Sequence, residues 1–479
     1  MATLGFFYSY HLPELKIWAI ERIEKISREN APVRVLVSNI EFNFFPIGVS
    51  LKNIRVTPQK ELAEVANEAF IKEVRLSLNP FSFLTGLFQF SKVEIIEPQI
   101  SIKNILAIDK LKKPDSKEPK FTLKSILQIP LSVFIVHRME LNIDPQGDIP
   151  KINLSQFSLE VENQKTSALI SFISPKLIVY DPKIADIPAE ISLGSRILIQ
   201  EDQILVSALK IKKGESYILA GGYTQTPLSK IKFDEVSFKI KTHLILDQLR
   251  KDASPFLKTT KLPEMSGLFE SQTQIVKNPQ EPISAETKLH FKNLKIEQFN
   301  LGSVIGQLFY KDDVVQAPLM QLQNSAGKVQ IKDLQMNVKD QSNFKFNITT
   351  EGLQLQEVLK NLGLGELPVV LGVKTQGLPC QGNLKENSLL KCQGEMNLEK
   401  LRVYNSKLDI VRVSNATIKG AVEVTKTQVI TSGDISAGKS TKGHAQGYVD
   451  YEKGFKFDYE SNNFNLSDAD VANLDLRGN

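Results

Sequence analysis

One segment of this chain matches a nucleotide-binding motif letter for letter. Residues Gly433–Ser440 read GDISAGKS, the G-x-x-x-x-G-K-S pattern in which backbone N–H groups and a helix N-terminus hold a phosphate. That chemistry needs a strand before the loop and a helix after it. The residues after Ser440, TKGHAQGYVDYEKGFKF, instead alternate like a strand and contain three glycines. A related turn upstream, Ser325–Lys328, lacks the first glycine and the final serine, so we predict a hairpin turn and no nucleotide site.

The other residue types that could do chemistry are scattered. No histidine lies at a metal-ligand spacing from another histidine or a cysteine, and no G-x-S-x-G nucleophile elbow is present. Asp312 and Asp313 fall in a turn, where solvated carboxylates are ordinary. We therefore expect no metal, no cofactor and no enzymatic activity. The histidines are His11, His137, His243, His290 and His444.

The two cysteines, Cys380 and Cys392, are the one informative pair. A hairpin turn within Gly382–Ser388 would place them on adjacent strands within bridging distance. Two reduced, partly buried thiols are the alternative that the sequence leaves open. With no further cysteine or histidine nearby, zinc is not expected. A disulfide would indicate an oxidising compartment.

The elements that must position these residues are strands built on one six-residue pattern: apolar, two polar or small residues, apolar, one polar, apolar. A half-buried strand alternates with period two, and in each copy the alternation slips by one residue. A bulge explains the slip, because it bends the strand and keeps the apolar residues on one face. An amphipathic helix is the rival, but prolines and β-branched residues argue against it. The copies are Val37–Phe42, Leu51–Val56, Ile71–Leu76, Phe90–Ile95, Val136–Leu141, Leu154–Leu159, Val206–Ile211, Phe233–Phe238, Phe291–Ile296, Ile331–Met336 and Leu398–Val403.

Composition sets the outer bounds. The 479 residues exceed one ordinary compact core, so several domains or a repeat array are expected. Hydrophobic content of 42% and charged content of 24% are typical of an ordered protein. The net charge of +5 suits a weak preference for anionic lipid head groups and is not a nucleic-acid footprint. No window approaches the roughly 20 continuous apolar residues of a membrane-spanning helix.

The clearest helix is predicted over Pro13–Glu29, with Pro13 at its first position. Its apolar stripe at three- and four-residue spacing comprises Leu12, Leu15, Ala19, Ile23 and Ile26. Because the opposite face mixes acidic and basic residues, we favour a helix that caps the end of a β-sheet. The alternative is a helix at a membrane surface with Trp18 at the head-group level. Met1–Leu12 is too short for a signal-peptide core with a cleavage site.

Domain boundaries follow from a charged break and from a longer repeat. Lys110–Lys120 reads KLKKPDSKEPK and predicts an exposed linker. In the C-terminal half, Leu262-Pro263 recurs as Leu367-Pro368, and Phe344–Ile348 recurs as Phe455–Tyr459, as in repeat architectures. Short helices are expected over Leu244–Arg250, Leu353–Leu362 and Leu466–Leu474. The expected parts are an N-terminal helix, 1–30; a β module, 31–109; the linker, 110–122; a β segment, 123–261; and two β repeats, 262–366 and 367–479, the last incomplete.

The order of these segments resembles the N-terminal region of the AsmA-like family, which comprises AsmA- and TamB-type proteins. In that family a strand pair around a P-x-G turn leads to an l-x-n-v-x-v strand, and a segment ending l-l-x-G leads to a strand ending P-x-i-x-i. The corresponding segments here are Pro46–Val49, Leu51–Val56, Val74–Gly86 and Val93–Ile102. The C-terminal repeats are similar to the periplasmic β-repeats of the same family.

This resemblance implies a mainly β fold, an elongated, twisted, open β-sheet groove related to chorein-type bridge-like lipid-transfer proteins. It implies a periplasmic protein held at the inner membrane of a diderm bacterium, although the anchor is not visible in this chain and 1–30 would be its remnant. The implied function is non-enzymatic transport of phospholipid or other acyl-chain lipid between inner and outer membranes, or outer-membrane assembly with an outer-membrane protein. The alternative is a scaffold of an envelope secretion apparatus, similar to GspN-type proteins.

The strand pattern independently predicts an apolar surface on one face of a curved sheet. That face either folds over itself into a dry sandwich or leaves a trough that acyl chains can occupy. The residues expected to line it are Ile54, Val56, Val74, Leu76, Val93, Ile95, Val236, Phe238, Leu294, Ile296, Leu334 and Met336.

Overall fold

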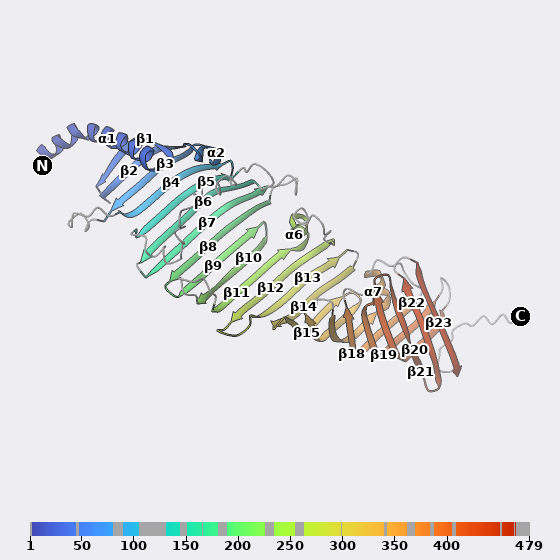
Figure 1. Ribbon diagram of the computed structural model, residues 1–479. Coiled ribbons are helices and arrows are strands. Elements are labelled where there is room, and N and C mark those ends of the chain that lie inside the picture. Colours follow the sequence, from blue (N-terminus) through green and yellow to red (C-terminus); the bar gives the residue numbers. More distant parts are fainter. Residues whose placement is uncertain are drawn as a thin grey trace. The chain divides into compact units, whose positions relative to one another are not determined.

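The computed structural model describes two compact units. Unit 1 comprises Met1–Lys239 and Pro255–Lys258, and unit 2 comprises Ile240–Ser254 and Thr259–Asn479. The residues described are 2–44, 47–79, 90–104, 131–143, 151–164, 166–180, 189–225, 234–253, 263–297, 299–339, 343–361, 369–383, 388–404, 409–450, 453–463 and 465. Most of them are in strands (Figure 1).

The described residues of unit 1 form two helices and a run of strands. The helices are α1 (Ala2–Asn30) and α2 (Leu62–Val65). The strands are β1 (Val33–Phe44), β2 (Ile47–Pro58), β3 (Ala69–Leu78), β4 (Phe90–Ile102), β5 (Val133–Ile143), β6 (Lys151–Gln164), β7 (Ser167–Tyr180), β8 (Ala189–Gln200), β9 (Gln203–Lys213) and β10 (Ser216–Gln225). Strand β11 (Glu235–Ile245) begins in unit 1 and ends in unit 2.

Unit 2 continues the same plan. Its helices are α6 (Leu246–Ala253) and α7 (Leu355–Asn361). Its strands are β12 (Met265–Lys277), β13 (Ser284–Ile296), β14 (Phe299–Lys311), β15 (Val314–Asn324), β16 (Gly327–Asn337), β17 (Asn343–Gln354), β18 (Val369–Asn383), β19 (Ser388–Tyr404), β20 (Asp409–Thr425), β21 (Gln428–Ala437), β22 (Thr441–Asp450) and β23 (Gly454–Asn463).

Strands that follow one another in sequence pair side by side. From β1 to β10 the pairs are antiparallel, except that β4 and β5 are parallel. From β12 to β23 every described pair is antiparallel. The strands belong to a 23-stranded sheet, and no pairing among the described residues closes it into a barrel. The expected mainly β, open-sheet fold with few short helices is confirmed.

The slip in the strand pattern corresponds to a local change of backbone conformation. In six copies the third residue has a positive φ: Asn53 (49°), Arg138 (51°), Gln156 (55°), Asn293 (52°), Asp333 (56°) and Lys400 (58°). In the copy Val206–Ile211 the register shifts opposite Ser207, as at a bulge. One left-handed residue resets the alternation, so Leu51 and Ile54, three residues apart, pack in the same apolar cluster. The predicted irregularity is therefore present in these copies, and its commonest form is a single left-handed residue.

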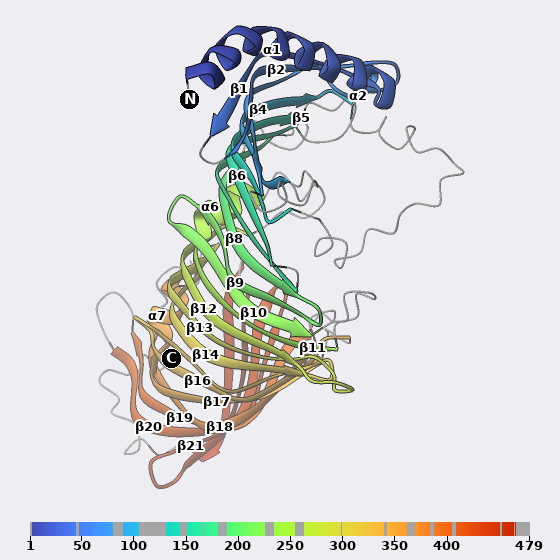
Figure 2. The same cartoon turned by 90° about the vertical axis from the view of Figure 1, so that its left-hand side faces the viewer.

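Helix α1 differs from its prediction at its start and in its contacts. It begins at Ala2, and Pro13 lies inside it. Ala19, Ile20 and Ile23 pack on the sheet of unit 1, and Figure 2 shows the helix lying across β1 and β2. Leu15 and Ile26, expected in the buried stripe, are 48% and 44% exposed. The stripe prediction was wrong at these two residues, because the contact of α1 with the sheet is made by Ala19, Ile20 and Ile23 and leaves Leu15 and Ile26 largely open to solvent.

Several predicted segments can be placed. Gly433 lies inside β21, residues 438–440 form a turn with Gly438 at φ 57°, and β22 follows. The hairpin reading of Gly433–Ser440 is therefore confirmed. Helices α6 and α7 confirm two of the three short helices. The linker 110–122 and the helix predicted over Leu466–Leu474 lie outside the described residues.

Candidate functional site: the apolar face of the sheet

The strand register places apolar residues of unit 1 on one face. Leu51 on β2 pairs with Val74 on β3, and Val74 pairs with Ile95 on β4. Cross-strand partners lie on the same face of a sheet, so this row is continuous. The parallel pair β4–β5 extends it, because Ile95 is opposite Val136.

Strands β5 to β10 continue this face. Further rows of cross-strand partners are Val136, Leu159 and Phe172; Leu141, Leu154 and Leu177; and Ile197, Val206 and Gly222. Phe157 and Phe172 bring their rings to 6.4 Å between centroids. A Cβ built on Gly222 would meet the Cα of Phe238 at 2.7 Å, so Phe238 lies beside Gly222 and Val236 shares its face by alternation.

Unit 2 has an apolar face of the same construction. Ile296 on β13 pairs with Met265 and Phe299, and Leu334 on β16 pairs with Ala317. The row of Met336 continues through Phe344 to Gly382 on β18. Figure 2 shows that the strands of unit 2 are strongly curved. All twelve residues predicted to line a trough therefore lie on the apolar face of their unit.

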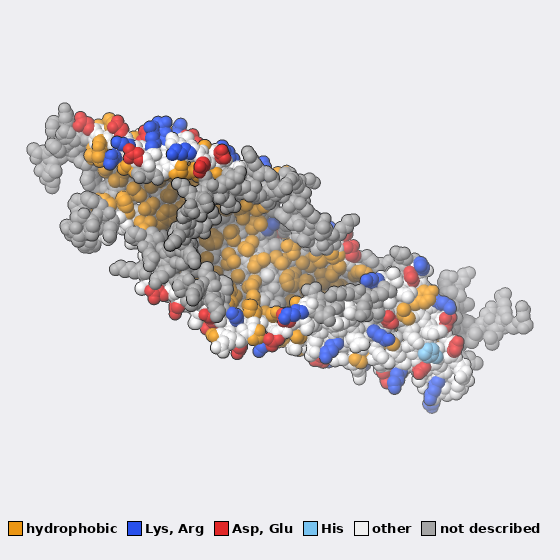
Figure 3. All heavy atoms as spheres, in the orientation of Figure 1, with side chains coloured by type: hydrophobic (Ala, Val, Ile, Leu, Met, Phe, Trp, Pro, Cys, Tyr) orange, Lys and Arg blue, Asp and Glu red, His pale blue; other side chains and the backbone are white. Residues whose placement is uncertain are grey.

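Helices cover only part of this face. Ile54 is 3% exposed in the cluster under α1, and Leu294 is 6% exposed beside Leu246 of α6. The other ten predicted residues are half-buried. Among the described residues no helix packs on β5 to β10 and no strand packs face to face on another. In Figure 3 hydrophobic side chains gather in a hollow over these strands, with charged side chains along its edges.

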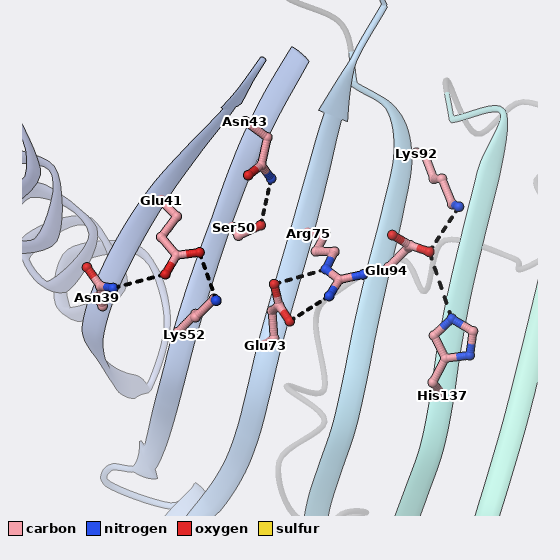
Figure 4. Close-up of polar contacts among 10 residues, drawn as sticks. All are labelled: Asn39, Glu41, Asn43, Ser50, Lys52, Glu73, Arg75, Lys92, Glu94 and His137. Carbon is pink, nitrogen blue, oxygen red and sulfur yellow. Dashed lines mark hydrogen bonds and ion pairs between the residues drawn. The ribbon is translucent and has the colours of Figure 1, made fainter. Parts of the chain in front are cut away.

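The opposite face of unit 1 carries charges that pair with one another, both within a strand and across strands (Figure 4). The Lys52 ammonium lies 2.8 Å from the Glu41 carboxylate. Arg75 donates two hydrogen bonds to Glu73, at 2.9 and 3.0 Å, and these bonds lower the pKa of the Glu73 carboxyl. A hydrogen bond with Glu41 raises the pKa of Lys52. This row stabilises the wet face and leaves its cations paired with carboxylates. The labelled contacts also include Asn39, Asn43, Ser50, Lys92, Glu94 and His137.

The cysteines form a disulfide inside the apolar face of unit 2. Cys380 on β18 and Cys392 on β19 are cross-strand partners, joined by an S–S bond and 4% and 5% exposed. They pack with Leu378 and Met396 in one buried cluster. Of the two alternatives that the sequence leaves open, the structure has the bridged one.

A depression of about 670 Å³ opens at the ends of β15 to β19. Met336 and Phe344, from the apolar face, are among its lining residues. Lys345 and Lys391 also border it, but the register places them in the neighbouring row, whose side chains lie on the opposite face. The other lining residues are Val314, Gln335, Asn337, Asn343, Gln381, Gly382 and Asn383. No carboxylate is among the described lining residues.

One group of chemically capable side chains was missed in the sequence. His444 lies between Ser432 and Asp434, with hydrogen-bond contacts of 3.1 Å and 2.9 Å. Ser432 and Asp434 are on β21 and His444 is on β22, 10 to 12 residues away. The signal was present: in a hairpin over 428–450, alternate residues place all three on one face.

Other classes of site are not found in the described part of the chain. No set of His, Cys, Asp and Glu side chains there is suited to holding a metal ion. Within the same residues, no helix has the length and apolar character needed to cross a membrane. Comparison with protein-family models, curated proteins and solved structures gives no match.

Proposed function

We propose that this chain is a non-enzymatic carrier of acyl-chain lipid, phospholipid above all, which it holds on the apolar face of its sheet. The observation that carries the proposal is the apolar face of β5 to β10. Most of its side chains are half-buried, and Val136, Ala168 and Ile199 are buried, although no second layer packs on it among the described residues. An extended apolar surface is expected to have an apolar occupant. Each CH₂ group transferred onto it from water contributes about 0.8 kcal/mol.

The ends of the strands are where we place the lipid head group. The rows of apolar residues run across the strands, and the band that they form is bounded by the strand ends. An acyl chain lying on this band therefore meets water at the strand ends. The depression beside Met336 and Phe344 opens at such an end.

The proposed location is the periplasm of a diderm bacterium, at the inner membrane. The resemblance to AsmA-like proteins supports it, and so does the Cys380–Cys392 bridge, because disulfides persist in oxidising compartments. In that setting the lipid would pass between inner and outer membranes, or the carrier would serve outer-membrane assembly together with an outer-membrane protein.

Native mass spectrometry of the purified full chain tests the proposal. We expect bound species with phospholipid masses, lost on delipidation and regained from phosphatidylglycerol vesicles. Val236→Asp places a charge on the apolar face and is expected to reduce bound lipid several-fold. Ser237→Asp places the same charge on the opposite face of the same strand and is the matched control.

Two outcomes would contradict a lipid carrier. A chain that neither retains nor takes up lipid would favour the alternative of a secretion-apparatus scaffold. Equal lipid loss in the Val236→Asp and Ser237→Asp variants would show that the apolar face is not where lipid binds. Thermal unfolding of both variants establishes that the comparison is made on folded protein.

A further inference from the structure

The polar face of unit 2 holds a Ser–His–carboxylate arrangement that lipid carriage does not use. His444 Nδ1 is 2.9 Å from Asp434 Oδ1, and His444 Nε2 is 3.1 Å from Ser432 Oγ. The residues alternate along β21 with Thr431, Gly433 and Ile435, whose partners lie on the apolar face. The group therefore faces away from the proposed lipid surface.

Hydrogen-bond chemistry gives the direction of this chain of contacts when the imidazole is neutral. An ionised carboxylate can only accept, so Nδ1–H of His444 donates to Asp434. In the neutral ring Nε2 carries a lone pair, which accepts the hydroxyl proton of Ser432. This tautomer is the one in which an imidazole acts as general base toward a serine.

The neighbouring strand supplies a candidate donor for a developing oxyanion. Gln446 on β22 is the cross-strand partner of Ser432, so its side chain leaves the sheet on the same face as the serine. Side-chain amides serve as oxyanion donors in acyl transfer. Nucleophile, base, orienting carboxylate and donor thus come from one hairpin.

A looser version elsewhere in unit 2 provides an internal comparison. His290 Nε2 is 3.3 Å from Ser303 Oγ, but His290 Nδ1 is 3.9 Å from Glu270, beyond hydrogen-bond distance. Lys292 lies 2.7 Å from the same carboxylate. The orienting bond that Asp434 makes to His444 is therefore missing at His290.

We propose that Ser432 is an activated nucleophile and that this hairpin cleaves small, activated carboxylic esters. This is a second activity, separate from the lipid carriage, which itself involves no catalysis. Ser432 Oγ bonds to the acyl carbon as its proton passes to His444 Nε2. The alcohol leaves with that proton, and water, deprotonated in the same way, releases the acid and restores the serine. Asp434 is 82% exposed and His444 is 49% exposed, so the acceleration is at the low end of the roughly 10²- to 10⁴-fold supplied by general-base catalysis.

The test uses the full chain and a fluorophosphonate, in which the serine displaces fluoride from phosphorus while His444 takes the proton. Peptide mass spectrometry locates the adduct. We expect Ser432 to be labelled at least about tenfold faster than Ser303. His444→Gln should reduce labelling of Ser432 about tenfold or more, and Asp434→Asn should reduce it less because that carboxylate is hydrated. Hydrolysis of p-nitrophenyl acetate should fall in Ser432→Ala and not in the matched control Ser303→Ala.

Labelling of the unaltered chain is decisive without any variant. Adducts spread evenly over Ser432, Ser303 and other serines would overturn the proposal, as would unchanged labelling of Ser432 in a folded His444→Gln protein. Neither result bears on lipid binding, because the two faces are tested separately.

Discussion

At the scale of single residues, apolar positions that occupy equivalent places in the sequence pattern differ in how deeply their side chains are buried. Ile54 and Ile95 occupy the same face on β2 and β4. Ile54 lies under α1 and is 3% exposed, whereas Ile95 is half-buried. The cost of a charge depends on whether water can reach it, so the two positions should respond differently to the same substitution.

Ile54→Asp is expected to lower the free energy of unfolding of unit 1 by about 3 kcal/mol or more, because it buries an unpaired carboxylate. Ile95→Asp should cost less than half as much, since its carboxylate can stay hydrated. Denaturant unfolding followed by a probe in unit 1 measures both. Equal losses would mean that the face at β4 is as dry as the cluster under α1.

The polar face gives a pH-dependent prediction. Hydrogen bonds from Arg75 lower the pKa of Glu73 in the folded state, so the pair stabilises the fold above the ordinary carboxyl pKa. That contribution is lost as the pH falls through the lowered folded-state pKa. Glu73→Gln should therefore be less stable than the unaltered protein at neutral pH, and the difference should shrink in strong acid.

Unfolding midpoints at neutral and acidic pH check this expectation. Glu160→Gln, a change on the polar face of β6, is the comparison. A stability difference for Glu73→Gln that does not change with pH would rule out the ion pair as its source.

At the scale of the element, the left-handed residue inside a strand is the recurring device. Asn53 sits at φ 49° between Lys52 and Ile54, and it returns the apolar residues of β2 to the face under α1. Asparagine tolerates this conformation better than other residues with a Cβ, and β-branched residues tolerate it least. The six-residue pattern thus requires a residue that tolerates the left-handed conformation at its third position, as well as apolar residues at its first, fourth and sixth positions.

Substitutions at Asn53 should follow backbone preference and not hydrophobicity. Asn53→Val is expected to destabilise unit 1 by about 1–2 kcal/mol, whereas Asn53→Gly should be nearly neutral. Arg55→Val is the control, because it adds the same side chain at a residue of β2 with ordinary strand conformation. Thermal unfolding of the three variants measures these changes in stability. An Asn53→Val protein more stable than the unaltered one would contradict the left-handed conformation of Asn53.

At the scale of the whole molecule, the chain is organised as two compact units, each with its own apolar face. Stability is therefore expected to be a property of each unit, and a single unfolding free energy is not defined for the chain. The Cys380–Cys392 bridge belongs to unit 2 alone and closes a loop of sequence separation 12. Its removal should be felt in that unit.

Replacing both cysteines by alanine should lower the stability of unit 2 by about 2–3 kcal/mol, the usual effect of opening a short loop. Hydrogen exchange, read separately for β12 to β23 and for β1 to β10, should show faster opening in unit 2 only. Thiol labelling of unreduced, denatured protein should find no reactive cysteine. Two labelled thiols would contradict the bridge in the protein as isolated.

The sequence by itself determined the β class, the strand irregularities, the hairpin at Gly433–Ser440 and the side of the sheet on which the twelve apolar residues lie. These follow from period-two alternation and turn chemistry, which act over a few residues. The tertiary structure decided which of those residues are covered, because the contacts of α1 with Ile54 and of α6 with Leu294 join segments distant along the chain. It also decided that the two cysteines are bridged and not reduced, and it placed His444 between Ser432 and Asp434. Both depend on strand register, which sets the distance between residues of adjacent strands and cannot be read from composition.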